Sequence, residues 1–381
     1  MTKYLKIIFY LTIILFWRCK SPSETNAISF SQKNIYETDT YCIDVDVSDS
    51  TIVLAVSNGG YLRIKYELDS NNFPVFTEII PQQDHSSEYN NDSIDRVILS
   101  NSTVGEGVVY MLDKYSGGSS GIWFDNENGI SIEPGFTNDY CYQGKYLDIT
   151  LDESEPDNFL GYTTHIIYSL MKHTDLNENS DDDEFLQYST SLVKRQINVV
   201  PNSDSGTLQS IDLVLDDCNY ISNLSYDSKE INYNHDKLVV ANETEGVIVF
   251  EKNESQNFDR TLTFNKSGGE AQCVLALENA VIGGFSNDKG CYMALLESDT
   301  NIPTNLINFA EGYSVKGIDY DNGIIGLATG NDGVKLYQWQ GGEFISPYAN
   351  LDTEYAYDLK IKGNLIYIAT RQGLEIYKIG F

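Results

Sequence analysis

The sequence predicts an all-β protein folded as a β-propeller of four-stranded blades, and two observations carry this prediction. First, residues 313–337 and 355–377 repeat one pattern, and their equivalent glycines, Gly333 and Gly373, lie about 40 residues apart, the period of a propeller blade. Second, the chain has 27 tyrosines and 16 phenylalanines, which suit many short strands because aromatic rings pack well on half-buried pleated surfaces.

Each copy of the repeat contains tight turns between strand-like runs. In the first copy, an alternating stretch leads to a turn at 321–323, and an apolar run ending in Ala328-Thr329 follows. Gly333 then opens another alternating run. Period-two apolar runs bounded by Gly, Asn and Asp are typical of strands joined by hairpin turns. Glycine and asparagine are favoured in these turns because they tolerate positive φ.

Less regular copies of the same unit precede these two. The turn glycine recurs along the chain at Gly60, Gly121, Gly246, Gly290, Gly333 and Gly373. The interval from 121 to 246 is the long one, and its contents, about 139–200, suggest one large irregular unit. The sequence therefore predicts seven blades, with six and eight as the alternatives.

The last unit supplies only three strands before Phe381. Residues 28–36 form the first alternating run after the leader and can supply the fourth strand. A single unit cannot bury its apolar face, so the units must stack into a closed ring. We predict that 28–36 pairs with the last blade and closes the ring.

The repeat resembles the LVIVD-repeat β-propellers of bacterial surface and secreted proteins. The residues that carry the resemblance are GVIVFE (246–251), GVKLYQ (333–338) and GLEIYK (373–378), together with YCIDVDVSDS (41–50). It covers most of residues 41–381 and is strongest after about 230. The resemblance implies the propeller fold and very little about chemistry, since function depends on sites and not on folds.

The N-terminus predicts export. Lys3 and Lys6 precede an apolar stretch at 7–17, which is too short to span a bilayer comfortably. Cys19 follows directly and resembles the lipid-attachment site of bacterial lipoproteins. We therefore expect a signal peptide at 1–18, lipidation of Cys19, a tether at 19–27 and a single propeller domain at 28–381. The alternative is ordinary signal cleavage nearer Ala27. Either way, the expected location is the cell envelope of a bacterium, as an outer-membrane lipoprotein or at the cell surface.

The net charge limits the classes of partner. With 25 basic and 56 acidic side chains, the formal charge is −31. Such a surface repels nucleic acid phosphates and anionic lipid head groups. We therefore expect no nucleic acid partner, membrane contact only through a lipid anchor, and a monomer that binds a protein or a small-molecule or glycan ligand.

An acidic insertion at about 172–185 favours Ca²⁺, because alternating oxygen ligands suit this cation. The candidate ligands are Asp175, Asn177, Asn179 and Asp181. Ser180 stands where an EF-hand loop has glycine, and Leu186 stands where it has a bidentate glutamate. A looser Ca²⁺ site is therefore the metal hypothesis here, and a solvated acidic loop is the alternative. We expect no other cofactor.

A second acidic pattern lies at the start of the first unit. Asp44 and Asp46 alternate along a strand and therefore share one face. If this is the innermost strand of a blade, both carboxylates line the central channel. Several such faces would form an acidic funnel that binds a cation or raises carboxyl pKa values. The alternative is a pair of solvated strand residues.

The remaining cysteines are Cys42, Cys141, Cys218, Cys273 and Cys291, and an exported protein permits disulfides. Cys273 and Cys291 lie within one unit and form the best candidate disulfide. The others are predicted to be small buried fillers beside the channel. The spacing of the four histidines does not favour a histidine-based metal centre.

These patterns favour a non-enzymatic, cell-envelope propeller that acts as a ligand- or protein-binding scaffold, with no catalytic residue assigned. The alternative is a propeller enzyme of the hydrolase, lyase or sugar dehydrogenase type, with an acidic or Ca²⁺-assisted site at the channel. An enzyme should bring two carboxylates, or a histidine and a carboxylate, to a common point in a pocket.

Replacing Cys19 by alanine should release the protein from membranes, because the proposed anchor is attached to that thiol. Fractionation of the expressing bacterium measures the release, and Ser21→Ala is the control that should stay in the membrane fraction. Membrane retention of Cys19→Ala would contradict lipidation.

Overall fold

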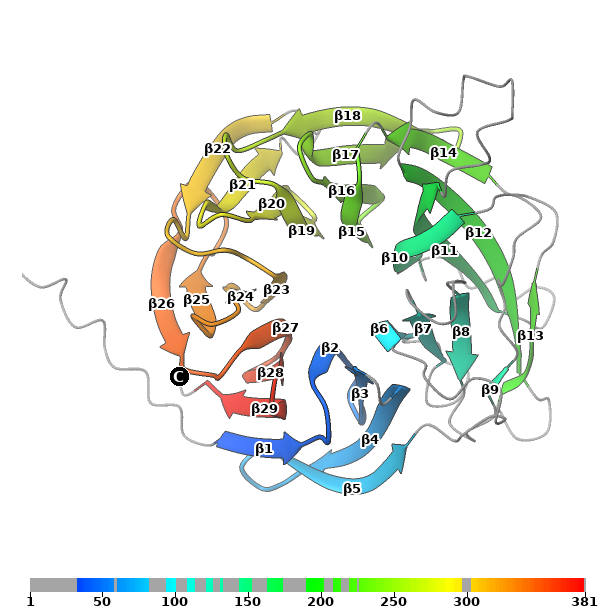
Figure 1. Ribbon diagram of the computed structural model, residues 1–381, viewed down its shortest axis with the longest axis vertical. Coiled ribbons are helices and arrows are strands. Elements are labelled where there is room, and N and C mark those ends of the chain that lie inside the picture. Colours follow the sequence, from blue (N-terminus) through cyan, green and yellow to red (C-terminus); the bar gives the residue numbers. More distant parts are fainter. Residues whose placement is uncertain are drawn as a thin grey trace, which may run out of the picture.

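The structure is a computed structural model (Figure 1). It describes residues 33–57, 60–81, 94–100, 108–113, 121–125, 131–132, 144–152, 163–173, 190–201, 208–213, 219–224, 226–296 and 303–379. Within these ranges, no helix is long and apolar enough to cross a membrane.

Seven antiparallel sheets surround a central channel, so the prediction of a seven-bladed propeller is confirmed (Figure 1). Blade 1 consists of β2 (Cys42–Val47), β3 (Thr51–Val56), β4 (Gly60–Leu68) and β5 (Pro74–Pro81). Blade 2 consists of β6 (Ile94–Leu99), β7 (Val109–Asp113), β8 (Gly121–Asp125) and β9 (Ser131–Ile132). Blade 3 consists of β10 (Gly144–Asp152), β11 (Thr163–His173), β12 (Thr190–Pro201), β13 (Leu208–Leu213) and β14 (Asn219–Leu224).

The second half of the chain builds the more regular blades. Blade 4 consists of β15 (Ser228–Asn234), β16 (Lys237–Asn242), β17 (Gly246–Lys252) and β18 (Phe258–Phe264). Blade 5 consists of β19 (Ala271–Leu277), β20 (Ala280–Phe285), β21 (Gly290–Leu296) and β22 (Pro303–Phe309). Blade 6 consists of β23 (Gly317–Asp321), β24 (Ile324–Ala328), β25 (Val334–Gln338) and β26 (Ser346–Leu351). Blade 7 consists of β27 (Ala356–Lys362), β28 (Leu365–Thr370), β29 (Gly373–Lys378) and β1 (Lys33–Glu37).

The N-terminal strand closes the ring, as the sequence predicts. β1 is the outermost strand of blade 7 and pairs antiparallel with β29, from Lys33 opposite Tyr377 to Glu37 opposite Gly373. Blade 7 therefore contains strands from both ends of the chain (Figure 1).

Blade 3 is the irregular unit expected between positions 121 and 246. The outer edge of its long strand β12 pairs with β13 along one half and with β14 along the other. One five-stranded sheet thus accounts for the long spacing between Gly121 and Gly246. This sheet ends at 224, whereas the sequence predicts an end near 200. Most of the acidic insertion at 172–185 lies outside the described residues.

The turn glycines begin or directly precede the third strand of their blades, and a close approach of backbone explains them. Gly333 and Gly373 have φ of 72° and 129°, a region that favours glycine. A Cβ on Gly333 would collide with the carbonyl oxygen of Leu351, and a Cβ on Gly373 with that of Tyr36. Each glycine therefore lets the fourth strand end against the start of the third.

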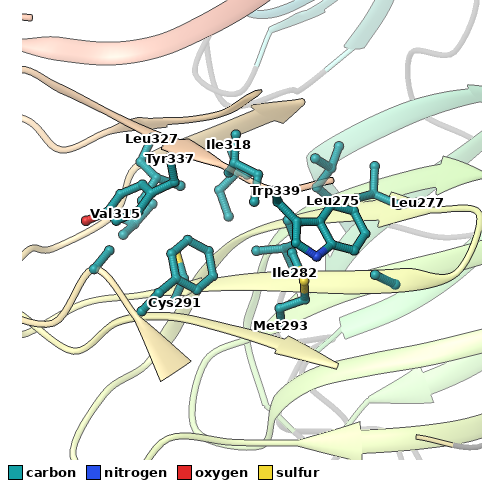
Figure 2. Close-up of a cluster of buried hydrophobic side chains, with 14 of the residues drawn as sticks. Leu275, Leu277, Ile282, Cys291, Met293, Val315, Ile318, Leu327, Tyr337 and Trp339 are labelled. Carbon is teal, nitrogen blue, oxygen red and sulfur yellow. The ribbon is translucent and has the colours of Figure 1, made fainter. Parts of the chain in front are cut away.

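The core lies between blades. The second strand of a blade is covered on both faces by its neighbours, so every residue of β3, β16, β20 and β28 is buried. Figure 2 shows the cluster between blades 5 and 6, in which Met293, Ile318 and Trp339 pack together. The Trp339 indole N–H donates to the carbonyl oxygen of Gly342 at 2.9 Å, so its polar atom is satisfied.

The predicted disulfide between Cys273 and Cys291 is wrong, because both thiols are free and buried. The two residues pair with opposite sides of Gly284 on the intervening strand β20. They are therefore two strand spacings apart, roughly 9–10 Å, which is well beyond the Cα separation of a disulfide. The expectation of buried cysteine fillers is met by Cys42, which is fully buried and also free.

The turn connectivity divides the ring into two faces. Strands alternate in direction, so turns between the first and second strands, and between the third and fourth, lie on one face. We call this the AB face. The opposite face, called the DA face, carries the turns between the second and third strands and the loops that join blades.

Removing residues 28–36 should lower the melting temperature by more than about 5 °C, because β29 loses its outer partner and the ring opens. Thermal unfolding followed by circular dichroism measures the change, relative to a chain that starts at residue 20. A chain that starts at residue 28 is the matched control and should melt as the reference does. An unchanged melting temperature without 28–36 would contradict closure by β1.

Candidate functional site

The innermost strand of each blade places side chains at equivalent depths around the channel. In six blades, the first of these positions directly follows an irregularity in the pairing with the second strand. We call this set ring 1: Asp44, Arg96, Asp148, Glu230, Cys273, Gly317 and Asp358. Two residues further along each strand is ring 2: Asp46, Ile98, Thr150, Asn232, Leu275, Asp319 and Lys360.

The acidic side chains that the sequence places on the channel hold neighbouring blades together. Asp44 Oδ2 accepts a hydrogen bond from the Val97 backbone N–H at 2.7 Å, and Asp46 Oδ2 accepts one from Leu99 at 2.8 Å. Both donors belong to β6, the innermost strand of the next blade. The two carboxylates are two residues apart on β2, and the two N–H groups are two residues apart on β6. The spacing of acceptors therefore matches the spacing of donors.

The same arrangement recurs at three further junctions. Asp148 and Thr150 accept from Ile231 and Tyr233, Glu230 and Asn232 accept from Val274 and Ala276, and Asp319 and Asp321 accept from Ile361 and Gly363. The donor–acceptor distances run from 2.6 Å for Asp319 to 3.5 Å for Glu230. Side-chain oxygens of the innermost strands therefore form a repeated inter-blade contact, which in blade 6 is shifted by two residues, from rings 1 and 2 to Asp319 and Asp321.

Arg96 is the cation at the centre of ring 1. Its Nη1 lies 3.5 Å from Asp44 Oδ1 and its Nε lies 3.6 Å from Asp148 Oδ1. Both carboxylates are almost fully buried, with side chains 4% and 3% exposed. The guanidinium thus bridges the innermost strands of blades 1 and 3, and it occupies the point on which the two carboxylates converge.

The carboxyls of ring 1 are shifted toward their protonated forms. Burial raises the pKa of Asp44 well above its usual value although Arg96 lowers it, and a hydrogen bond with the Asp358 carboxyl raises it further. Burial also raises the pKa of Asp358. Carboxyls packed this closely cannot all ionise, so the ring retains protons. The upward shift expected for an acidic funnel is therefore found at Asp44.

Glu230 titrates in the neutral range. Burial raises its pKa to about 7, and the carboxylate of Asp148 raises it as well, while Arg96 opposes the shift. Its carboxyl group accepts a long hydrogen bond from the Val274 N–H, at 3.5 Å. A change of pH across neutrality therefore changes the charge of the channel wall.

Lys360 is the cation of ring 2. Its Nζ lies 3.9 Å from Asp46 Oδ1 and 4.0 Å from Asp319 Oδ1, and its side chain is 33% exposed. Burial lowers its pKa, but the carboxylates of Asp319 and Asp46 outweigh this and leave it above the usual value. Lys360 is therefore charged at all ordinary pH values.

A cavity of about 580 Å³ opens from these rings onto the AB face. Asp44 and Arg96 form its floor, and five ring 2 residues line its wall: Asp46, Ile98, Thr150, Asn232 and Lys360. Its rim carries His235 and Asp236, which form the turn between β15 and β16. The cavity is therefore the outer part of the central channel.

The metal hypothesis for Asp44 and Asp46 finds no support from this geometry. Both carboxylates accept backbone N–H groups, and in the described part of the chain no three His, Cys, Asp or Glu side chains gather as metal ligands would. The other predicted site residues lie outside the described residues: Cys19, Asp175, Asn177, Asn179 and Asp181.

The structure describes three of the four histidines, and it describes the side chains of two of them, His165 and His235. His165 is buried, with its Nδ1 against the Tyr110 hydroxyl, and burial lowers its pKa to about 4, so it is neutral. His235 has positive φ in an exposed turn at the cavity rim.

The DA face carries an aromatic cluster where the ring closes, formed by Tyr41, Tyr355, Tyr357 and Arg371. The rings of Tyr41 and Tyr357 stack with centroids 6.1 Å apart, and those of Tyr355 and Tyr357 lie 4.5 Å apart. The Arg371 guanidinium lies 5.6 Å from the Tyr41 centroid and 5.0 Å from that of Tyr355. Tyr41 is 48% exposed. We call these four residues the seam cluster.

Comparison with known proteins identifies the fold and no closer relationship. No protein-family model and no curated protein matches the chain. Among solved structures, the WD40 repeats of RRP9 align with a TM-score of 0.59 at 13% identity, covering 94% of this chain and 100% of that one. U3-55K aligns with a TM-score of 0.59 at 12% identity, covering 93% and 100%. A chain of the mitotic checkpoint complex aligns with a TM-score of 0.58 at 10% identity, covering 95% and 96%.

Glu230→Gln should make stability less dependent on pH. The folded-state pKa of Glu230 is raised to about 7 from 4.5, so its contribution to stability is complete below about pH 4.5 and is lost as pH rises through about 7. Glutamine mimics the protonated acid. The variant should therefore gain about 1–2 kcal/mol in unfolding free energy relative to the natural protein between roughly pH 5 and pH 8.5.

Urea unfolding of both proteins at the two pH values measures this difference. Glu278→Gln changes an exposed glutamate in the next blade and is the matched control, with no expected pH-dependent gain. An equal free-energy difference between Glu230→Gln and the natural protein at both pH values would contradict the raised pKa.

Proposed function

We propose that this protein is a non-enzymatic scaffold of the bacterial cell envelope, and that it binds a protein partner through the DA face. The observation that carries the proposal is the seam cluster. Tyrosine and arginine are the residue types enriched among the strongest contributors to protein interfaces. Here they stand together on a rigid part of the ring, with Tyr41 half exposed.

The seam cluster is preorganised for binding. Tyr357 is in β27, Arg371 is in the turn between β28 and β29, and Tyr41 directly precedes β2. The mutual ring contacts fix the side chains before a partner arrives, so little conformational entropy remains to be lost on binding. The Arg371 guanidinium can still donate hydrogen bonds to an incoming acceptor while it lies over the two rings.

The comparisons support a scaffold by analogy of fold. The mitotic checkpoint complex is an assembly of proteins, and a chain of it has the same architecture as this chain. Identity is only 10%, so this likeness concerns the fold, and the binding role is argued from the seam cluster.

The channel geometry favours a scaffold over a propeller enzyme. Asp44 and Asp148 do converge, but Arg96 of the same chain fills the convergence point. Their remaining oxygens accept the backbone N–H groups of Val97 and Ile231. A general acid or base needs a free proton position facing a substrate, and the oxygens of both carboxyls are already engaged by Arg96 and by backbone N–H groups.

The cell-envelope part of the proposal rests on the leader. The basic start, the apolar stretch at 7–17 and Cys19 together match the pattern of an exported lipoprotein. The net charge of −31 suits a protein that stays soluble outside the cell and does not associate with nucleic acid.

A photo-crosslinking amino acid at Tyr41 should capture one protein partner in intact cells of the native host. The same amino acid at Phe344 is the matched control, because Phe344 is 77% exposed but lies between β25 and β26 on the AB face. Arg371→Ala should weaken the Tyr41 crosslink about tenfold, the loss expected for a residue at the centre of an interface. Equal capture from both positions, or capture that Arg371→Ala leaves unchanged, would contradict the proposal.

A further inference from the structure

We propose that the cavity on the AB face binds a neutral, hydroxyl-rich ligand, namely a short segment of an uncharged glycan. This inference concerns the face opposite the seam cluster and stands independently of the proposed protein-binding function. The cavity volume of about 580 Å³ is that of a small-molecule site and fits two or three sugar rings.

Positively and negatively charged side chains lie next to each other at the bottom of the cavity. Arg96 lies 3.5 Å from Asp44, and Lys360 lies 3.9 Å from Asp46. All four side chains line the cavity, and the two further carboxylates of the lining, Asp152 and Asp236, both pair with Lys252. An anionic ligand that reached Arg96 or Lys360 would also meet carboxylates within about 4 Å, and a cationic ligand that reached the carboxylates would meet the two cations. A ligand without net charge avoids both penalties.

Side chains that line the cavity keep hydrogen-bond donors and acceptors with which the hydroxyl groups of a ligand can pair. The Lys360 ammonium has its carboxylate neighbours at 3.9 and 4.0 Å, beyond hydrogen-bonding distance. Asn232 lines the cavity and accepts the Ala276 N–H through its Oδ1, so its amide group keeps two donors.

Acceptors stand beside these donors. The Oδ1 and Oδ2 of Asp46 each accept one backbone N–H, from Val47 and Leu99, so each oxygen keeps a second lone pair. A sugar hydroxyl accepts one hydrogen bond and donates another, and can therefore bridge Lys360 and Asp46. Neither an ammonium nor a carboxylate can do both.

The wall also has an apolar part. Ile98 is the aliphatic member of ring 2 on this side, and it lines the cavity next to Leu99 and Leu151. A pyranose ring presents C–H groups on one face and hydroxyls at its edge. Apolar wall beside closely spaced polar groups is the combination that such a ring needs, and it is typical of small-molecule sites.

Isothermal titration calorimetry of a chain that starts at residue 20 with six neutral trisaccharides tests the proposal: maltotriose, cellotriose, xylotriose, mannotriose, laminaritriose and N,N′,N″-triacetylchitotriose. At least one should bind with a Kd below about 1 mM. Trigalacturonate and the cationic chitosan trimer are the charged comparators and should bind more weakly. Failure of all six neutral sugars, or tighter binding of either charged trimer, would overturn the proposal.

Variants locate the site. Lys360→Met keeps the aliphatic stem and removes the donors, so it should weaken the bound sugar about tenfold or more. Lys362→Met is the matched control, because Lys362 is on the same strand and pairs with Asp49 outside the cavity lining. Ile98→Asp removes the apolar contact and adds a charge to the cavity wall, so it should also weaken binding, and it provides the test if Lys360→Met fails to fold. Binding that Ile98→Asp leaves unchanged, or that Lys362→Met weakens as much as Lys360→Met, would overturn the assignment.

Discussion

The unpaired edges of the innermost strands are the constraint on which the rest of this ring depends. Each of these strands has a hydrogen-bonded neighbour on one side only, and its other edge faces the channel. Buried backbone N–H groups need partners, and an open edge without them is a liability. Asp44 and Asp46 satisfy the edge of the next blade, and carboxylate, amide or hydroxyl oxygens do the same at three further junctions. Part of the large negative charge therefore has a structural purpose.

This solution concentrates carboxyls in a narrow space, and the channel compensates in two ways. Arg96 and Lys360 supply positive charge, and several carboxyls keep their protons because burial raises their pKa values. The junction between blades 5 and 6 uses different chemistry. Its ring positions include Cys273 and Leu275, which offer no oxygen, and the apolar cluster around Trp339 packs there instead (Figure 2). Polar and apolar junctions thus coexist in one ring.

The features that repeat regularly along the chain were those that the sequence could predict. The seven blades and the closing strand followed from turn glycines and alternating runs, because packing imposes those patterns locally. The channel position of Asp44 and Asp46 was also predictable from alternation. Their partners were not, because Val97 and Leu99 donate through the backbone, which any residue can do. The channel position of Arg96 was not predicted, because the sequence of blade 2 departs strongly from the repeat pattern. Aligning Tyr41-Cys-Ile-Asp44 with Tyr355-Ala-Tyr-Asp358 would have added Asp358 to the ring. The disulfide failed because one unit spans four strands, and residues two strands apart cannot bond.

Closure by β1 also determines the face on which the chain enters the ring. As the fourth strand of blade 7, β1 runs from the AB face to the DA face, so the chain joins the ring at Lys33 on the AB side. The AB cavity opens on this same side, and the seam cluster lies on the opposite one. The pairing of one strand thus separates the two candidate binding surfaces by their position relative to the point where the chain enters the ring.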